Sequence, residues 1–80
     1  MRYCTYILKS QKNGDVYVGS TGNFEGRLSA HNGGRVRSTK PYRPWIVLEI
    51  RECTSRSEAV RLEKFLKTGQ QKELLKKKYV

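Results

Sequence analysis

Residues 3–20, with the sequence YCTYILKSQKNGDVYVGS, decide the fold of this chain. Residues 3–9 alternate in character and are rich in the aromatic and β-branched side chains that favour strands. Asn13-Gly14 is a strong signal for a tight turn between antiparallel strands, and strand-forming residues resume from residue 15 to residue 20. The stretch therefore predicts a β-hairpin.

A short helix is expected directly after the hairpin. Residues 21–23 offer an N-terminal cap, and the helical spacing continues to about His31. Asn32-Gly33-Gly34 then ends the helix. A basic loop follows and leads to Pro44.

Residues 45–53 begin with WIVLEI, the most hydrophobic run of the chain, and predict a central strand. Ser55 and Glu58 have the spacing of a capping box for a second helix, which we expect to end near residues 68–69. Residues 70–78 predict a last, shorter helix. The order β-β-α-β-α-α indicates an α/β (α+β) fold with a small three-stranded, mainly antiparallel sheet flanked by helices.

The length and composition fit a small globular protein. Eighty residues allow one domain over residues 1–80 and leave no room for a second. The hydrophobic fraction of 36% is ample for a core, and no run approaches the roughly 20 apolar residues of a membrane span. Because the N-terminus enters a strand directly, without a signal peptide, we expect a soluble, cytoplasmic protein with no membrane partner.

The two cysteines, Cys4 and Cys53, do not make a disulfide framework. The chain has one histidine, and the cysteines lack the spacing of metal ligands. We therefore expect both cysteines to be small buried hydrophobic residues.

The charge of the chain favours a nucleic-acid partner. Seventeen lysines and arginines against seven acidic residues give a net charge of +10. The loop over residues 33–43 contains no acid, and its bases are Arg35, Arg37, Lys40 and Arg43. The lysine-rich tail over residues 72–78 is as consistent with a solvated helix face as with a nucleic-acid contact.

Polar and charged residues interrupt the apolar faces of two predicted helices. Phe24 and Leu28 mark the stripe of the first helix, and Arg27 and His31 share its side. Glu63 completes the stripe of the second helix. Burying one unpaired charge costs several kcal/mol, whereas a chain of this length is stable by only about 4–12 kcal/mol. These three polar groups must therefore pair closely or face a wet cleft.

Two tyrosines of the hairpin join this set. Tyr6 and Tyr17 lie on neighbouring strands, and the strand register decides whether they share a face. Gly19 offers backbone access that a side chain would block. An arginine can bind phosphate, a carboxylate can hold a hard divalent cation, and a phenol or imidazole can orient or deprotonate water. The set of side chains suits hydrolysis of phosphodiesters.

Four short motifs resemble, in order and spacing, those of the GIY-YIG nuclease superfamily over nearly the whole chain. The resemblance is to its small single-domain bacterial branch, which is related to the catalytic domain of the excision-repair endonuclease. Cys4-Thr5-Tyr6 stands where the family has Gly-Ile-Tyr, and Tyr17-Val18-Gly19 stands at Tyr-Ile-Gly. Arg27-Leu28-Ser29-Ala30-His31 matches its Arg-x-x-x-His element, and Ala59-x-x-x-Glu63-x-x-x-Lys67 matches its metal-binding helix.

The resemblance implies a metal-dependent endonuclease that hydrolyses phosphodiester bonds, with a role in DNA repair. DNA is favoured over RNA as its substrate, although the sequence leaves that choice open. Glu63 would be the sole protein ligand of one Mg²⁺ or Mn²⁺ ion. Tyr6 would be the favoured general base or water-orienting group, and Tyr17 and His31 would complete its hydrogen-bond network. Arg27 would neutralise the scissile phosphate. Because the ordinary pKa of tyrosine is near 10, a base role for Tyr6 needs nearby positive charge or metal-bound water, which Arg27 and the cation could supply.

Charge and resemblance together also indicate the binding partners. The expected nucleic-acid contacts are Arg35, Arg37, Lys40, Arg43 and Lys67. Ser20 stands where the DNA-repair members carry a lysine. We expect the loss of that positive charge to weaken phosphate binding. Members with known biology usually carry an additional DNA-binding domain, so a recruiting protein is a further expected partner. The oligomeric state stays open.

Two other interpretations stay open at this point. One is a non-catalytic nucleic-acid-binding module on the same fold, although such a module has no need for Glu63 on an apolar stripe. The other is purely structural: Arg27 and Glu63 form a salt bridge between the helices, and His31 is a satisfied core histidine.

Overall fold

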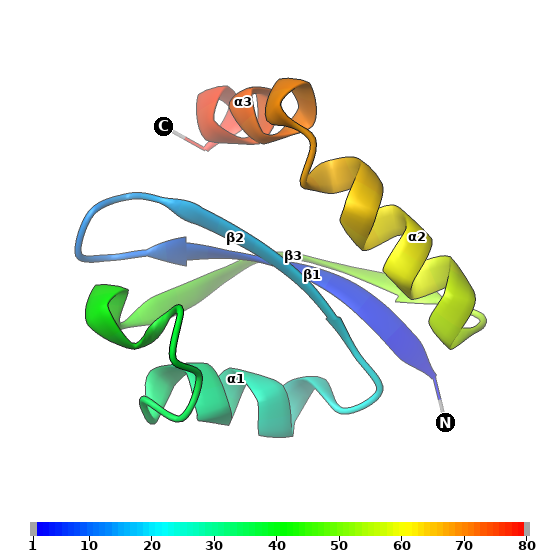
Figure 1. The fold of residues 1–80 in the computed structure, drawn as a ribbon, viewed down its shortest axis with the longest axis horizontal. Coiled ribbons are helices and arrows are strands. Elements are labelled where there is room, and N and C mark those ends of the chain that lie inside the picture. Colours follow the sequence, from blue (N-terminus) through cyan, green and yellow to red (C-terminus); the bar gives the residue numbers. More distant parts are fainter. Residues whose placement is uncertain (1, 80) are drawn as a thin grey trace.

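Three antiparallel strands form the centre of the computed structural model, which describes residues 2–79 (Figure 1). They are β1 (Tyr3–Ser10), β2 (Val16–Thr21) and β3 (Trp45–Cys53), and their order in the sheet is β2-β1-β3. Gly14 adopts a φ of +77° in the tight turn between β1 and β2, a conformation that glycine adopts readily. The predicted hairpin is confirmed.

The helices are α1 (Phe24–Asn32), α2 (Arg56–Leu66) and α3 (Gly69–Lys78). A single 3₁₀ turn at Lys40–Tyr42 lies inside the region expected to be a loop. The predicted order β-β-α-β-α-α and the α+β class are therefore confirmed. Within residues 2–79, no helix combines the length and the apolar character that crossing a bilayer requires.

Side-chain caps begin two helices where the sequence places them. The Asn23 side-chain oxygen accepts a hydrogen bond from the Gly26 amide at 3.2 Å, and Ser55 Oγ accepts one from the Glu58 amide at 3.2 Å. The Glu58 carboxylate accepts a hydrogen bond from the Thr54 hydroxyl at 2.6 Å. The N-cap half of the predicted capping box is thus formed, and the Glu58 side chain stabilises the preceding turn instead.

The strand over residues 45–53 lies at an edge of the sheet, so the prediction that it is central was wrong. The central strand is β1, whose residues 5–8 are at most 1% exposed. On β3, by contrast, Ile46, Val47 and Ile50 are 41%, 38% and 48% exposed. The most hydrophobic strand is not the most buried one, for two reasons. Strand β1 buries polar side chains because their hydroxyl groups form hydrogen bonds, and part of the apolar run of β3 faces solvent.

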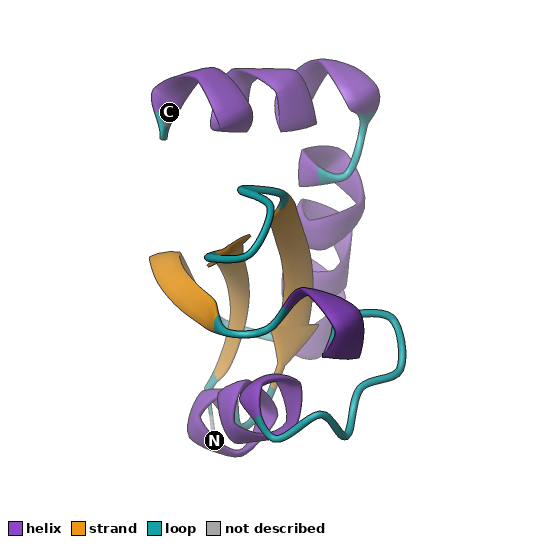
Figure 2. Cartoon of the chain, turned by 90° about the vertical axis from the view of Figure 1, so that its left-hand side faces the viewer, coloured by secondary structure: helices purple, strands orange, loops and turns teal. Residues whose placement is uncertain are grey.

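Helices cover both faces of the sheet, as predicted (Figure 2). Against α2 and α3 lies a hydrophobic cluster of Ile7, Val16, Val18, Leu66 and Leu75. Against α1 lies a second cluster of Cys4, Tyr6, Leu8 and Trp45, with Phe24 and Leu28 packed on it. Successive side chains of β1 alternate between the two clusters, as strand geometry requires. The two cysteines are buried and free, as expected.

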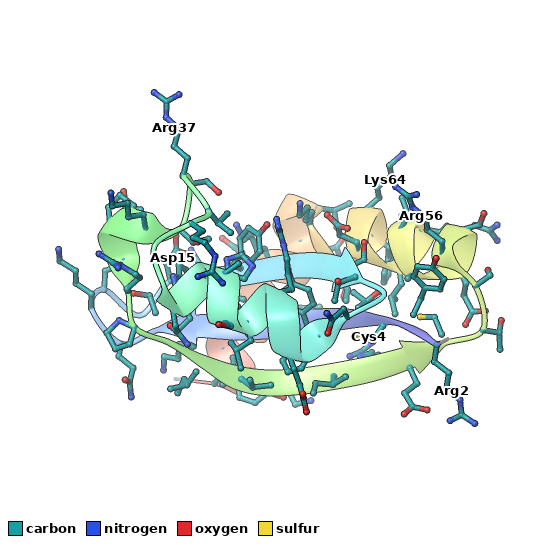
Figure 3. All side chains as sticks on the ribbon, turned by 90° about the horizontal axis from the view of Figure 1, so that it is seen from below. Arg2, Cys4, Asp15, Arg37, Arg56 and Lys64 are labelled. Carbon is teal, nitrogen blue, oxygen red and sulfur yellow. The ribbon has the colours of Figure 1, made fainter. Side chains whose placement is uncertain are left out.

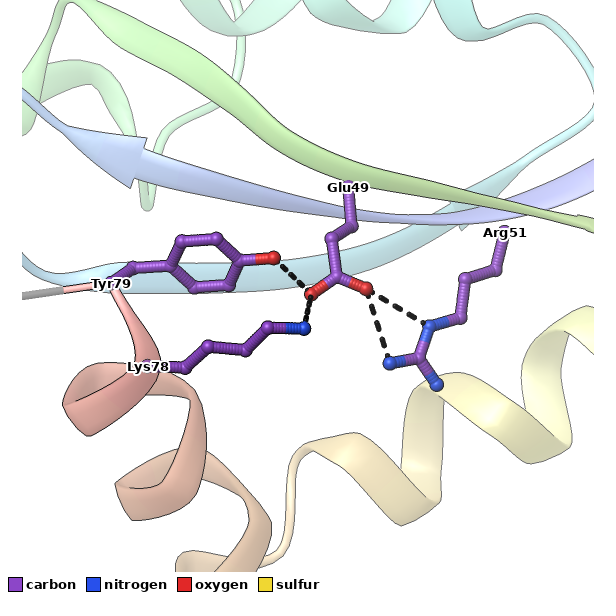
Figure 4. A network of polar contacts seen from close by, with 4 residues as sticks. All are labelled: Glu49, Arg51, Lys78 and Tyr79. Carbon is purple, nitrogen blue, oxygen red and sulfur yellow. Dashed lines mark hydrogen bonds and ion pairs between the residues drawn. The ribbon is translucent and has the colours of Figure 1, made fainter.

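One carboxylate ties the end of α3 to β3 (Figure 4). Glu49 accepts a hydrogen bond from the Tyr79 hydroxyl, and it pairs with Lys78 Nζ at 3.1 Å and with Arg51 Nη2 at 3.1 Å. The Tyr79 hydroxyl first, and then the two cations, hold the pKa of Glu49 below its ordinary value, although partial burial opposes ionisation. The carboxylate is therefore ionised at neutral pH.

Glu49→Gln should lower the free energy of unfolding at pH 7 by about 1 kcal/mol, because the variant loses charge-assisted bonds to three donors. In a thermal melt this corresponds to a fall in Tm of about 4–8 °C. The folded-state pKa of Glu49 lies below the unfolded value, so its contribution is complete above the ordinary pKa of 4.5 and is lost as pH falls through the folded value. Variant and wild type should converge in acid.

The matched control is Glu73→Gln, which removes an exposed carboxylate of α3 outside this network. Its Tm should stay within about 2 °C of the wild type. The same Tm for both variants at pH 7 would contradict the anchoring role of Glu49.

Candidate functional site

The strand register places the two hairpin tyrosines on one face of the sheet. Tyr6 pairs with Gly19, and Leu8 pairs with Tyr17, across β1 and β2. The tyrosine rings therefore lie diagonally opposite each other on the α1 face, with centroids 6.3 Å apart. The register, which the sequence left open, brings Tyr6 and Tyr17 together.

The ring of Tyr6 fills the space beside Gly19, so the expected open access to the backbone was wrong. A Cβ built on Gly19 would lie 2.6 Å from Cζ of Tyr6, closer than real contacts allow. The ring is confined because Tyr6 is 1% exposed and packs edge-on against Phe24, with centroids 5.5 Å apart. Close packing therefore requires glycine at this position.

His31 of α1 is fully buried against the same tyrosine. Its Nε2 lies 3.0 Å from the Tyr6 hydroxyl, and its Nδ1 lies 2.8 Å from Oγ1 of Thr39. Burial first, and the charge of Arg27 second, lower the pKa of His31, so the imidazole is neutral at pH 7. The Thr39 hydroxyl donates to the Val36 carbonyl at 3.4 Å. The hydrogen-bond network is then satisfied when Nδ1–H donates to Thr39 and Tyr6 donates to Nε2.

Tyr6 is held in its neutral form. Burial raises the pKa of Tyr6 to about 12, although the positive charge of Arg27 acts in the opposite direction. At pH 7 a phenol with that pKa is ionised in roughly one molecule in 10⁵. Without a bound cation, Tyr6 is therefore a neutral phenol that forms hydrogen bonds.

Thr39 is a site residue that the sequence did not indicate. It is buried in the loop between α1 and β3, and its carbonyl accepts a hydrogen bond from Trp45 Nε1 at 3.0 Å. Its hydroxyl is the partner of His31 described above. A single threonine in a basic loop has no periodic pattern, so the fold alone reveals this contact.

Glu63 approaches from the opposite side of the sheet, because it belongs to α2. At the edge strand β2, its Oε1 accepts a hydrogen bond from Ser20 Oγ at 2.5 Å, and its Oε2 pairs with Lys67 Nζ at 2.7 Å. Partial burial of the carboxylate opposes ionisation, but Lys67 and Ser20 outweigh it and hold the pKa of Glu63 below its ordinary value. An ionised carboxylate, with its side chain 21% exposed, therefore stands at the β2 edge.

Lys67 connects this carboxylate to the hairpin. While paired with Glu63, its Nζ lies 5.6 Å from the ring centroid of Tyr17. The Tyr17 ring in turn packs edge-on against the His31 ring, with centroids 4.9 Å apart. Groups from both faces of the sheet thus gather around β2.

Arg27 is exposed on α1. Its guanidinium is charged at any physiological pH, and the contact with the Tyr6 phenol raises the pKa of Arg27 above its ordinary value. Among the ion pairs of residues 2–79, none joins Arg27 to Glu63, whose partner is Lys67. The interhelical salt bridge of the structural interpretation was therefore wrong. His31, by contrast, is the buried and hydrogen-bonded histidine that this interpretation expected.

The predicted nucleic-acid contacts are all exposed, and they are Arg35, Arg37, Lys40, Arg43 and Lys67. Figure 3 shows Arg37 projecting on the side of the molecule that β2 lines, where Arg56 and Lys64 of α2 also project. Arg43 instead turns back and donates to the Lys40 carbonyl at 2.9 Å. The sequence did not indicate Arg56 and Lys64, because the side of the sheet to which they point depends on the packing of α2.

A divalent cation has one candidate ligand here. Within residues 2–79, no three His, Cys, Asp or Glu side chains gather into a metal cluster. The donor at the β2 edge is the single carboxylate of Glu63, which is hard, ionised and partly open to solvent. This donor fits Mg²⁺, which keeps several waters and is commonly held by only one or two carboxylates.

Residues 2–79 match the GIY-YIG catalytic domain. The chain belongs to the GIY-YIG family. The resemblance seen in the four motifs is confirmed, and the family supports a nuclease.

Two small bacterial proteins are similar to this GIY-YIG domain over most of its length. UPF0213 protein SH2523 of Staphylococcus haemolyticus is 36% identical over 76 residues, which are 94% of this chain and 92% of that protein. The solution NMR structure of UPF0213 protein BH0048 of Bacillus halodurans matches with a TM-score of 0.58 at 28% identity, covering 94% of this chain and 82% of that chain. The similarity to the small bacterial branch is thus confirmed in sequence and in fold.

Two longer fungal relatives are named as nucleases. The structure-specific endonuclease subunit slx1 of Schizosaccharomyces pombe is 47% identical over 51 residues, 56% of this chain and 19% of slx1. Its namesake in Aspergillus terreus is 40% identical over 68 residues, 76% of this chain and 17% of slx1. The GIY-YIG domain described here therefore matches less than a fifth of the length of either slx1 protein.

Gly19→Ala should destabilise the protein by about 1–3 kcal/mol, because the new Cβ overlaps the confined ring of Tyr6. Urea denaturation measures the loss. Gly69→Ala is the matched control, since no atom lies within 4 Å of a Cβ at that position and alanine favours a helix. Equal stability of the two variants would mean that the Tyr6 ring is free to move.

Proposed function

We propose that this GIY-YIG domain is a metal-dependent endonuclease that hydrolyses phosphodiester bonds in DNA, with one Mg²⁺ or Mn²⁺ ion held by Glu63. The observation that carries the proposal is the grouping at the β2 edge. There, Lys67 Nζ is 2.7 Å from Glu63 and 5.6 Å from the Tyr17 ring, so an ionised carboxylate stands next to the hairpin tyrosines. Membership of the family supports the class of reaction.

Glu63 and Ser20 form the metal-binding part of the proposed site. The hydrogen bond from Ser20 Oγ fixes the orientation of the Glu63 carboxylate, as hydrogen-bond donors to metal ligands commonly do. When bound there, the cation supplies Lewis-acid stabilisation of the phosphoryl oxygens. Ser20, which stands at a lysine position of the DNA-repair members, thus orients the ligand and adds no charge.

Arg27 binds the scissile phosphate in this proposal. Its guanidinium is exposed and permanently charged, and its planar fork matches two phosphate oxygens at once. Because negative charge develops on those oxygens as the phosphodiester bond breaks, Arg27 stabilises the transition state more than the ground state.

Tyr6 and His31 orient the attacking water, and neither ionises in the resting enzyme. The Tyr6 hydroxyl donates a hydrogen bond to Nε2 of neutral His31, so its oxygen can still accept a hydrogen bond from Arg27 or from water. Tyr17, half-buried and packed edge-on against His31, completes the wall of the site on the hairpin side.

Incubation with supercoiled plasmid and Mg²⁺ or Mn²⁺ should give nicked and linear DNA. Arg27→Ala should reduce the rate by about 10²–10³, because a donor that stabilises transition-state charge is lost. Glu63→Gln should abolish cleavage, because the neutral amide is a poor ligand for a hard cation. Gel electrophoresis of timed samples measures the rates.

The matched control is Glu25→Gln, which removes an exposed carboxylate from α1 and should leave the rate unchanged. Circular dichroism of each variant verifies the fold. Cleavage at the wild-type rate by Glu63→Gln would identify a contaminating nuclease and refute the proposal.

Binding to the DNA backbone is proposed for the exposed bases of the loop, and Arg37 tests it. Arg37→Ala should reduce the slope of log K against log salt concentration by about 1, because one phosphate contact and its counterion release are lost. Fluorescence anisotropy with a labelled duplex, without divalent metal, measures the slope. Arg2→Ala is the control, since Arg2 points away from the β2 side and pairs with Glu52 at 3.0 Å.

An equal effect of the two substitutions would contradict an interface on the β2 side. Salt-dependent binding by a wild-type protein that fails to cleave in the plasmid assay would support the non-catalytic binding module instead.

A further inference from the structure

The carboxylate of Glu63 is already occupied by groups of its own chain. Ser20 Oγ donates to Oε1 at 2.5 Å, and Lys67 Nζ pairs with Oε2 at 2.7 Å. The ammonium of Lys67 therefore lies against Oε2, an oxygen through which Glu63 would bind a metal ion. A divalent cation that binds Oε2 therefore meets an ammonium group at the same atom.

The ammonium of Lys67 has a second favourable contact close by. It lies 5.6 Å from the ring centroid of Tyr17, within the range in which a cation is attracted to an aromatic face. The Lys67 side chain is 44% exposed on its flexible stem, so it can leave the carboxylate without repacking the core. An ammonium released from the carboxylate is free to pair with a phosphate of DNA bound in the proposed function.

We propose that Lys67 is an internal counter-ion that competes with the divalent cation for Glu63, and that the cation binds by displacing the ammonium. The displaced ammonium stays beside Tyr17 and pairs with a phosphate of the substrate. This inference rests on the proposed function, because it takes Glu63 as the metal ligand. Lys67 is then a positioning residue that sets the affinity of the site for metal.

Thermodynamic linkage predicts the direction in which the Lys67–Glu63 ion pair changes the affinity for metal. An interaction that stabilises the metal-free state weakens metal binding by the same free energy. A partly exposed ion pair is weak, so its loss should change the affinity several-fold and not by many orders of magnitude. Because a bound phosphate gives the ammonium a new partner, DNA should compensate for the displaced ion pair, and metal and DNA should favour each other's binding.

Titration calorimetry with Mn²⁺ and no DNA tests the competition directly. The proteins are the wild type, Lys67→Met, Lys64→Met and Glu63→Gln. Lys67→Met should bind Mn²⁺ about three- to tenfold more tightly than the wild type. Lys64→Met removes the same charge from the last turn of α2, where it acts on the Glu63 carboxylate through space and not as its ion-pair partner, and its Kd should change by less than about twofold.

The outcomes separate this inference from the proposed function. If Glu63→Gln abolishes binding and Lys67→Met binds no more tightly than the wild type or Lys64→Met, Lys67 does not compete, although Glu63 is still the ligand. If Glu63→Gln binds Mn²⁺ as the wild type does, Glu63 is not the ligand, and both proposals fail. Misfolding cannot imitate the expected result, because the prediction is a gain of affinity; Lys67→Gln replaces Lys67→Met if the latter does not fold.

Discussion

Close packing of the Tyr6 ring on Gly19 is the constraint on which the rest of the site depends. It demands one register between β1 and β2, and a slip of one residue would turn the hairpin side chains to the opposite face. The same register brings Tyr17 beside Tyr6 and presents the Tyr6 hydroxyl to His31. Through Thr39, the His31 ring then ties the basic loop to α1. One contact between a ring and a glycine coordinates a hairpin, a helix and a loop.

The edge position of β2 lets a small sheet build a site from both of its faces. Arg27 belongs to α1 and Glu63 belongs to α2, and these helices lie on opposite sides of the sheet. Side chains from the two layers can approach each other only around a strand that has no further neighbour. Ser20 and Tyr17 of β2 take part from the strand itself, on opposite faces. The strand order is therefore as important for the chemistry as the identity of the residues.

Short sequence patterns predicted the helices and strands, whereas contacts between residues far apart in the chain determine how these elements are arranged. Caps at Asn23 and Ser55 act within one helical turn, so the sequence marks them directly. The edge position of β3 depends on which side of β1 the chain reaches after α1, and no local pattern records that. The sequence showed the polar and charged residues of the candidate site, because they interrupt apolar helix faces. It did not show which residue pairs with Glu63. Lys67 stands at the i+4 spacing that favours a pair, yet its proximity to the hairpin requires the packing of α2 on the sheet.

The exposed edge strand β3 has a consequence for how molecules of this protein behave among themselves. Its apolar side chains at Ile46, Val47 and Ile50 lie on a strand that has a neighbour on one side only, which is the kind of surface that recruits further strands. Mutual repulsion between chains of charge +10 opposes that recruitment, over a distance that shrinks from about 10 Å at 0.1 M salt to about 3 Å at 1 M. Charge repulsion thus contributes to the colloidal stability of the protein, together with the irregular register and the charged side chains of β3. A polyanion that neutralises many copies at once removes that protection and brings their hydrophobic edges within reach of one another.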